Sequence, residues 1–255
     1  MERRVADPAS RVPDPDARAE LTPTGKLRVG INFGNGLLAR KDPVTAAPRG
    51  IAVDLARELG VRVGVPVEVV GYESAGTMAD GATEAWDVAF LGADPARANQ
   101  IAFTAAYLEI ESTYLVPARS PLSTMADVDR AGVRIAVSGK SAYDLFLTRA
   151  LQHAMLVRAP NVNASVELFM SHKLDALAGL KPLLVEVAEQ LPGSRVLDGS
   201  FTTVQQAIGT PKDRSSAAKY LHAFVEDVKA GGLVAKAIEN NRVRGVSVAR
   251  HATVQ

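Results

Sequence analysis

The chain alternates between strand-like and helix-like segments, and this alternation constrains the fold more than any other feature. Residues 26–32 (KLRVGIN) alternate apolar and polar side chains as strands do, and residues 51–59 then carry an apolar residue at every fourth position, as an amphipathic helix does. A strand-like PVEVVGY, a predicted helix at 74–85 and a short apolar strand at 86–91 follow. Strands separated by helices predict right-handed crossovers and a parallel sheet.

A second alternation begins after two extended runs (101–105 and 112–117) and a connector at 119–123. Its predicted elements are strands at 133–137, 155–159 and 175–179 and helices at 142–152, 164–173 and 181–191. A strand-like segment at 204–210 then precedes Asp213, a candidate N-cap for an amphipathic helix, and a Gly-Gly break separates this helix from another at 233–241.

These two units predict an α/β fold with two lobes, each a mostly parallel sheet flanked by helices. Two hinge strands, near 114–118 and 204–210, would join the lobes. Residues 25–117 and 211–250 would form lobe 1, and residues 118–210 lobe 2. Residues 1–24 mix Pro, Asp, Arg and Ala without a sustained period, so we expect a flexible N-terminal arm. Ligands of such open sheets bind at the carboxyl ends of the strands, here between the lobes.

Composition removes several classes of function. The net charge is +1 and no basic stripe is visible, so nucleic acid is not expected as a partner. The chain has no cysteine, and we interpret its four histidines (His153, His172, His222 and His251) as surface residues; no metal or cofactor is expected. No run approaches the roughly 18 apolar residues of a membrane span, and the polar N-terminus has no signal-like apolar stretch.

Five segments between residues 26 and 241 resemble the family 3 solute-binding proteins of ABC importers, the group that includes the polar amino acid receptors. They are KLRVGIN, RGIAVDLARELG, WDVAFLGADPARANQIAFTAAY, GVRIAVSGKSAYD and QQAIGTPKDRSSAAKYLHAFVEDVKAGGLVAKAIEN, and they occur in the family's order and spacing. The resemblance implies the type II periplasmic binding fold and a monomeric protein that carries a small carboxylate ligand to an ABC permease. It also implies a periplasmic location.

In the resembled family, the arginine of a "TPER" segment binds the ligand carboxylate, and Arg97 of DPAR stands at that position. A guanidinium matches a carboxylate bidentately. The alternative is a surface arginine paired with Asp94.

The turn Gly139, Lys140 and Ser141 precedes a predicted helix and resembles the family's "SGTT" turn. Free N–H groups at a helix start can receive a carboxylate, and the Ser141 hydroxyl would add a donor. Alone, the pattern fits a plain N-cap serine equally well.

Two positions depart from the family pattern. Leu180 stands where the amino acid receptors carry an aspartate for the ligand ammonium, and Gly92 or Ala93 stands where they carry a serine. An ammonium buried against leucine would lose its hydration without gaining a partner. The ligand is therefore expected to be a carboxylate without an α-amino group.

Several polar and aromatic residues are further candidates for ligand contacts or for packing around the hinge. They are Asn32, Phe33 and Asn35 in the loop after the first strand, and Tyr107, Gln205 and Gln206 on segments expected near the hinge.

The leading hypothesis is a non-catalytic binding protein, with no catalytic residues. The resembled family also includes cyclohexadienyl dehydratases, so the alternative is a dehydratase in which Glu109 or Glu111, two residues apart on one strand face, is the acid. Solvated strand carboxylates would look the same. A sensory module is the third class, but the sequence shows no span or signalling segment.

Overall fold

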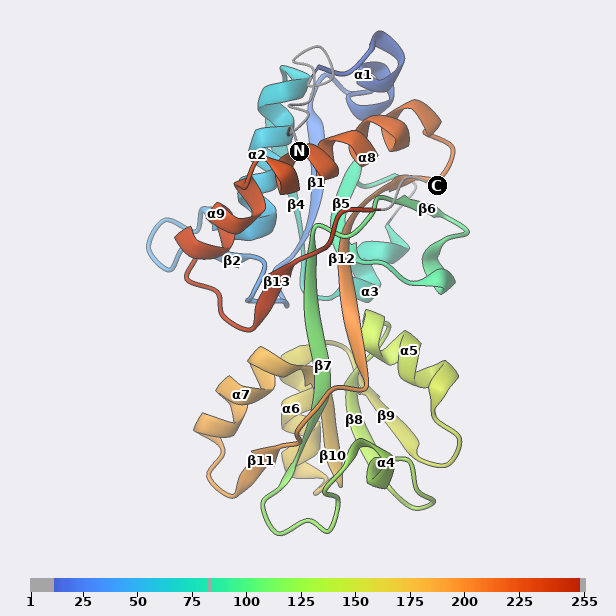
Figure 1. The fold of residues 1–255 in the computed structure, drawn as a ribbon, viewed down its shortest axis with the longest axis vertical. Helices are drawn as coiled ribbons and strands as arrows, with labels where there is room; N and C mark the ends of the chain where they lie inside the picture. Colours follow the sequence, from blue (N-terminus) through green and yellow to red (C-terminus); the bar gives the residue numbers. More distant parts are fainter. Residues whose placement is uncertain (1–11, 82–83, 253–255) are drawn as a thin grey trace, which may run out of the picture.

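The computed structural model describes residues 12–81 and 84–252, which form two α/β lobes joined by two long strands (Figure 1). The lobes share one curved sheet in which eleven strands of the described residues take part, in the main order β4-β1-β5-β12-β7-β10-β8-β9. The predicted fold class is confirmed.

Lobe 1 is built on three parallel strands, with β1 between β4 and β5. In chain order, its first elements are β1 (Leu27–Asn32), β2 (Arg40–Lys41), β3 (Pro48–Arg49), α2 (Ile51–Val63), β4 (Val67–Tyr72), α3 (Ala75–Asp80), β5 (Val88–Gly92), the 3-10 helix η2 (Pro95–Arg97) and β6 (Ile101–Phe103). The fourfold spacing in α2 buries Ile51, Leu55 and Leu59 against this sheet.

Lobe 2 repeats the architecture, with β8 pairing in parallel with β9 and β10. Its elements are α4 (Met125–Val128), β8 (Arg134–Ser138), α5 (Ala142–Ala150), β9 (Met155–Ala159), α6 (Val162–Ser171), β10 (Ala176–Leu180), α7 (Lys181–Gln190) and β11 (Ser194–Val196). The strand β10 is buried at every position, as expected of a strand covered on both faces.

The hinge is the antiparallel pair of β7 (Leu108–Pro117) and β12 (Thr202–Pro211). The two strands pair from Leu108 opposite Gln206 to Ser112 opposite Thr202. On β7, the residues that pair with β12 come earlier in the chain than the hinge segment predicted at 114–118. The later residues of β7 pair with β10 and β11 of lobe 2 instead. The lobe boundaries at 117 and 210 stay a prediction.

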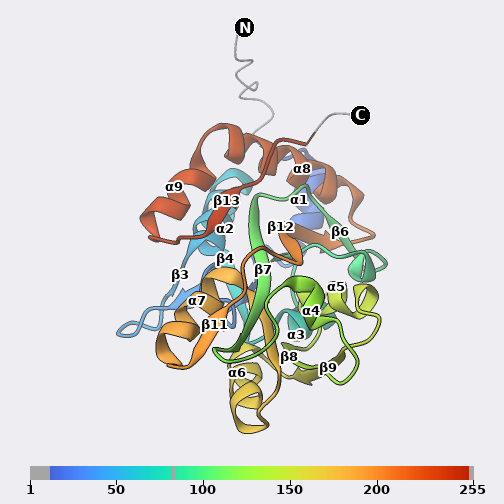
Figure 2. The same cartoon turned by 60° about the horizontal axis from the view of Figure 1, so that its bottom comes forward.

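The last elements return to lobe 1. They are α8 (Ser215–Ala230), α9 (Leu233–Asn240) and β13 (Val246–Val248). Helix α8 packs on α1 (Pro15–Leu21), and α9 packs on α2, at the end of the molecule away from α6 (Figure 2). Asp213 does not cap α8; the helix begins after Arg214, and Glu20 accepts a hydrogen bond from the backbone N–H of Ala217 instead.

The prediction of a flexible N-terminal arm is wrong for residues 15–21, which form a helix. Helix α1 (Pro15–Leu21) is capped by the Asp14 side chain, has proline in its first turn, and buries Ala17 and Leu21 completely. Its apolar residues are too few to reveal a period in the sequence, so the helix depends on its contact with α8. Residues 1–11 of the predicted arm lie outside the described residues.

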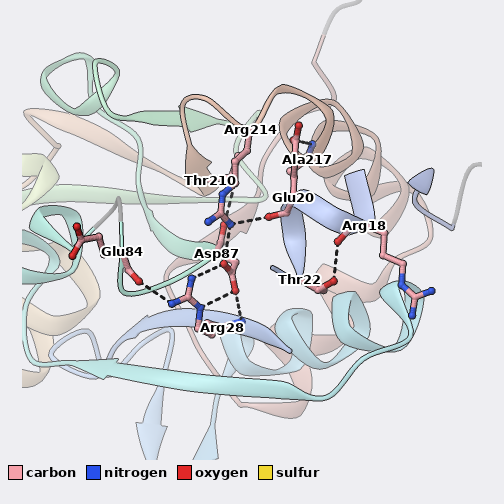
Figure 3. Close-up of polar contacts among 9 residues, drawn as sticks. All are labelled: Arg18, Glu20, Thr22, Arg28, Glu84, Asp87, Thr210, Arg214 and Ala217. Atoms are coloured by element: carbon pink, nitrogen blue, oxygen red, sulfur yellow. Dashed lines mark hydrogen bonds and ion pairs between the residues drawn. The ribbon is translucent and has the colours of Figure 1, made fainter. Parts of the chain in front are cut away.

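A buried carboxylate holds α1, β1, β5 and α8 together (Figure 3). Asp87, with no exposed surface, accepts hydrogen bonds from the backbone and guanidinium of Arg28 and from the guanidinium of Arg214. Arg214 also donates to the carbonyl of Glu20, and the Thr210 hydroxyl donates to the carbonyl of Asp87. The hydrogen bond to Asp87 raises the pKa of Arg28. Removing this charge would leave two largely buried cations unpaired.

We predict that Asp87→Asn lowers the free energy of unfolding by about 2–4 kcal/mol, because breaking one side of a buried ion pair leaves an uncompensated charge. The matched control is Glu68→Gln, which breaks the exposed Lys26–Glu68 pair and is expected to change stability by less than about 1 kcal/mol. Urea titration measures both. Equal losses in the two variants would contradict this role of Asp87.

Candidate functional site

A cleft lies where the carboxyl ends of the strands of both lobes meet at the hinge. Its wall residues are Asn32, Gly34, Asn35, Leu38, Glu73, Ser74, Ala75, Met78, Phe90, Leu91, Gly92, Ser138, Ser141, Ala142, Tyr143, Val162, Leu180, Leu183, Val204 and Gln206. The cavity that they enclose is about 50 Å³, room for no more than a few water molecules. A larger cavity of about 320 Å³ adjoins it and shares Gly34, Glu73, Val162 and Leu183.

The structure brings five of the ten predicted ligand residues together in this wall: Asn32, Asn35, Gly92, Ser141 and Leu180. Gly92 has a steric reason to be glycine. A Cβ there would lie 2.8 Å from the Ala142 Cβ in lobe 2 and 2.9 Å from Val204 Cγ1 on the hinge. The serine of the family pattern would therefore hold the lobes apart at this point.

The other five predicted residues lie elsewhere. Phe33 lies against Gly71 and Lys41 and lines a neighbouring cavity of about 320 Å³. Tyr107 is fully buried and packs edge-to-face on Phe90 in the core. The remaining three, Gly139, Lys140 and Arg97, are not in the wall, and Lys140 and Arg97 line a separate cavity of about 180 Å³.

The turn before α5 has the geometry of an N-cap serine, and the backbone N–H of Lys140 donates to the Asp144 carboxylate at 2.7 Å. Ser141 is the N-cap of α5, and its hydroxyl accepts a hydrogen bond from the backbone N–H of Asp144. The next two N–H groups, of Ala142 and Tyr143, precede any intrahelical acceptor, and both residues line the cleft. Lys140 has a left-handed backbone with φ of 56°, unusual for a residue with a side chain. This conformation lets its carbonyl face Arg97.

Arg97 joins the lobes. One Nη donates to the carbonyl of Gly92 in lobe 1, and the other donates to the carbonyl of Lys140 in lobe 2, both at 2.6 Å. The side chain is nearly buried and makes no ion pair within the described residues, so the predicted alternative of a surface arginine paired with Asp94 is wrong. Burial lowers the pKa of Arg97 to about 10, and the nearby charges of Asp94 and Asp80 oppose this shift.

Two ion pairs cross the cleft beside Arg97. Asp94, at the start of η2, is bound by both guanidinium nitrogens of Arg149 on α5, at 2.9 and 2.7 Å. Lys140 pairs with Asp80 at the end of α3, at 2.7 Å. The Asp94–Arg149 pair has bidentate geometry and one buried partner, which makes it the stronger of the two.

The cleft wall mixes apolar side chains with hydroxyl and amide groups and has few charged groups. Glu73, at its exposed rim, is the only acidic or basic side chain in the wall described above. Burial raises the pKa of Tyr143 to about 12, and hydrogen bonds to Ser141 and Ser138 partly oppose the shift. Of the two glutamines that the sequence indicates as candidates for ligand contacts, Gln206 is in the wall and Gln205 is not. A ligand in this cleft would meet hydroxyl, amide and backbone dipoles.

Sequence reasoning missed four polar wall residues, Glu73, Ser74, Ser138 and Tyr143. A signal existed for three of them. Glu73 and Ser74 are the first two residues after the predicted strand that ends at Tyr72, and Ser138 directly follows the predicted strand at 133–137. Side chains just past strand ends are the ones that face such a cleft.

Neither candidate acid lies in the cleft wall. Glu109 pairs with Gln205 and Ser247 in the β-ladders, and Glu111 forms an ion pair with Lys181 at 2.8 Å. All four histidines are exposed, as predicted. Within residues 12–81 and 84–252, no cluster of His, Asp or Glu has the geometry of a metal site, and no helix is long and apolar enough to cross a membrane.

Comparison with known proteins gives the class. The model of the bacterial extracellular solute-binding proteins, family 3, matches residues 40–241. The chain belongs to this family.

Individual relatives are distant. A glutamine-binding protein of Geobacillus stearothermophilus is 21% identical over 202 residues, which is 77% of each chain. A solute receptor for L-cysteine from Neisseria gonorrhoeae has a TM-score of 0.77 at 20% identity, covering 89% of this chain and 95% of the receptor. An ancestral amino acid-binding protein described as a precursor of cyclohexadienyl dehydratase has a TM-score of 0.72 at 21% identity, covering 88% and 98%. These structures share the fold.

We predict that Arg149→Gln weakens solute binding about two- to fivefold, because it removes an ion pair that exists only when the lobes are together. The loss should fade in 1 M salt, where screening leaves little of the pair to remove. Arg130→Gln is the matched control, since Arg130 pairs with Asp127 inside lobe 2. Calorimetry of both variants at low and high salt provides the test, and an equal effect of the two would contradict the cross-lobe role.

Proposed function

We propose that this protein is the periplasmic solute-binding component of an ABC importer and that it binds a small carboxylate, amino acid-like or an organic acid, between its lobes. Arg97 is the observation that carries the proposal. A buried cation without an ion pair is unfavourable by several kcal/mol, and a bound carboxylate would compensate it.

The hydrogen bonds of Arg97 leave room for a ligand. A guanidinium has five N–H donors, and two of them are directed to the carbonyls of Gly92 and Lys140. Gly92 is in the cleft wall, so the guanidinium is one hydrogen bond away from this wall, although Arg97 and Lys140 themselves line a separate cavity of about 180 Å³. A carboxylate that enters beside Gly92 would come within reach of this charge.

The N-terminus of α5 would bind the same carboxylate group of the ligand as Arg97. Its first N–H groups face the cleft from the opposite lobe, and the helix dipole adds partial positive charge there. Arg97 and α5 therefore approach one carboxylate from two lobes, which would couple binding to closure. The closed protein would then be the form that an importer permease recognises. We keep the prediction of a monomer.

The alternative of a dehydratase receives less support. It requires an acid in the cleft, and the two candidates from the sequence, Glu109 and Glu111, are not in the wall. The acid that is in the wall, Glu73, lies at its exposed rim.

We predict that Arg97→Ala abolishes solute binding and leaves the protein folded. Truncating one partner of a desolvated charge pair lowers affinity by about 30-fold to several thousandfold, from roughly 2–5 kcal/mol. A thermal-shift screen over amino acids, keto acids and aromatic carboxylates identifies the solute, since binding raises the melting temperature. Arg195→Ala is the control, because Arg195 also binds backbone carbonyls but lies outside the cleft. Unchanged affinity in Arg97→Ala would refute the proposal.

We predict further that the cleft prefers carboxylates without an α-ammonium over zwitterionic amino acids, by about tenfold or more. Leu180 is 5% exposed in the wall, so a ligand ammonium next to it would lose hydration without gaining a partner. Even about 1.4 kcal/mol of this cost lowers the affinity tenfold. Competition between an L-amino acid and its 2-oxo analogue measures the ratio. Leu180→Asp should reverse the preference. If the unchanged protein bound the amino acid more tightly, Glu73 would be the carboxylate to examine and our interpretation of Leu180 would be wrong.

A further inference from the structure

Two buried polar atoms have no hydrogen-bond partner within the described residues: the hydroxyl oxygens of Tyr107 and Ser112. Tyr107 directly precedes the hinge strand β7 and Ser112 lies in the middle of that strand, and neither residue has exposed surface. Nearly all buried polar groups in folded proteins are hydrogen-bonded, so an exception calls for a physical reason. Tyr107 is in the core behind Phe90. Ser112 lies closer to the middle of the hinge.

The register of the sheet directs Ser112 toward the cleft floor. Ser112 pairs with Leu180 on β10 and with Thr202 on β12. Residues opposite each other in antiparallel strands project to the same face, and Leu180 lines the cleft. Val204, two residues after Thr202, is on this face as well and also lines the cleft.

The neighbouring residue provides an internal comparison. Thr113 projects to the other face, and its hydroxyl donates to the carbonyl of Leu197 at 3.1 Å. Two adjacent buried hydroxyls on one strand therefore differ in one respect: the one that faces away from the cleft has a partner in the protein, and the one on the cleft side has none.

We propose that Ser112 is a solute-contacting residue, whose hydroxyl forms a hydrogen bond with a polar atom of the solute at the floor of the cleft. The proposal rests on the function proposed above. The present cavity is about 50 Å³, so any amino acid-sized molecule must separate Leu180 and Val204 from the opposite wall. That widening uncovers the floor on which Ser112 lies. The solute class is a small carboxylate with a second hydrogen-bonding group at its inner end.

The test is a pair of variants, Ser112→Ala and Thr113→Val, each of which removes one buried hydroxyl. The probes are L-glutamine, L-arginine, L-lysine, L-cysteine and their 2-oxo analogues, and the compound that raises the melting temperature of the unchanged protein most is titrated by calorimetry. We expect Ser112→Ala to raise the melting temperature without solute by about 2–6 °C, because an unsatisfied buried group is removed. Its affinity for the solute should fall about tenfold. Thr113→Val should do the reverse, with a lower melting temperature and unchanged affinity.

Each other outcome overturns the inference. Unchanged affinity in Ser112→Ala means that the hydroxyl does not meet the solute. A melting temperature that falls in Ser112→Ala means that the hydroxyl already has a partner, such as a water molecule. Equal loss of affinity in both variants means a general effect of the hinge. If no compound stabilises the unchanged protein, the proposed function fails together with the inference, whereas clear binding with an unaffected Ser112→Ala removes the inference alone.

Discussion

The antiparallel pairing of β7 with β12 is the interaction on which the rest of the structure depends. It joins the parallel strands of both lobes into one sheet, and it turns their carboxyl ends toward each other. The wall of the cleft follows from this geometry: Asn32 and Gly92 end strands of lobe 1, and Ser138 and Leu180 end strands of lobe 2. A ligand site at strand ends is the general rule for open α/β sheets. Here the hinge brings two such edges together.

Charged groups then hold the lobes together around a cleft that has little charge of its own. Arg97, Asp94 and Asp80 in lobe 1 bind Lys140 and Arg149 in lobe 2, along one side of the cleft. Separating charges from the site has a physical advantage, because ion pairs next to solvent can break and form with a small free-energy change. Arg97 differs from the others because it is buried and meets only carbonyl dipoles. The proposed function assigns it the role of binding the carboxylate for this reason.

The sequence predicts the βα units well because hydrophobic periodicity is a local property. It misses α1, because this helix depends on its contact with α8, about 200 residues later in the chain. Glu20 of α1 accepts a hydrogen bond from the backbone N–H of Ala217 in α8. It also predicts Tyr107 as a ligand contact. In the structure the Tyr107 side chain is buried in the core against Phe90, and no local sequence pattern indicates this contact. For Arg97 the motif indicates the right region, yet its partner carbonyl at Lys140 requires the left-handed turn and the closed hinge. Residues at strand ends are predictable, and contacts across the hinge are not.

Three unfavourable features of the structure lie at the cleft or next to it. Arg97 is a buried cation without an ion pair, Lys140 has a left-handed backbone, and Ser112 is a buried hydroxyl without a partner. Each lowers the stability of the folded chain by an amount of the order of 1 kcal/mol or more. Elsewhere in lobe 1, the deeply buried carboxylate of Asp87 is bound by two arginines. The buried charge of Asp87 is thus fully paired, whereas Arg97 and Ser112 near the cleft lack such partners. With the function proposed above, these groups would add to affinity, because the solute would relieve a deficit that the protein alone cannot remove.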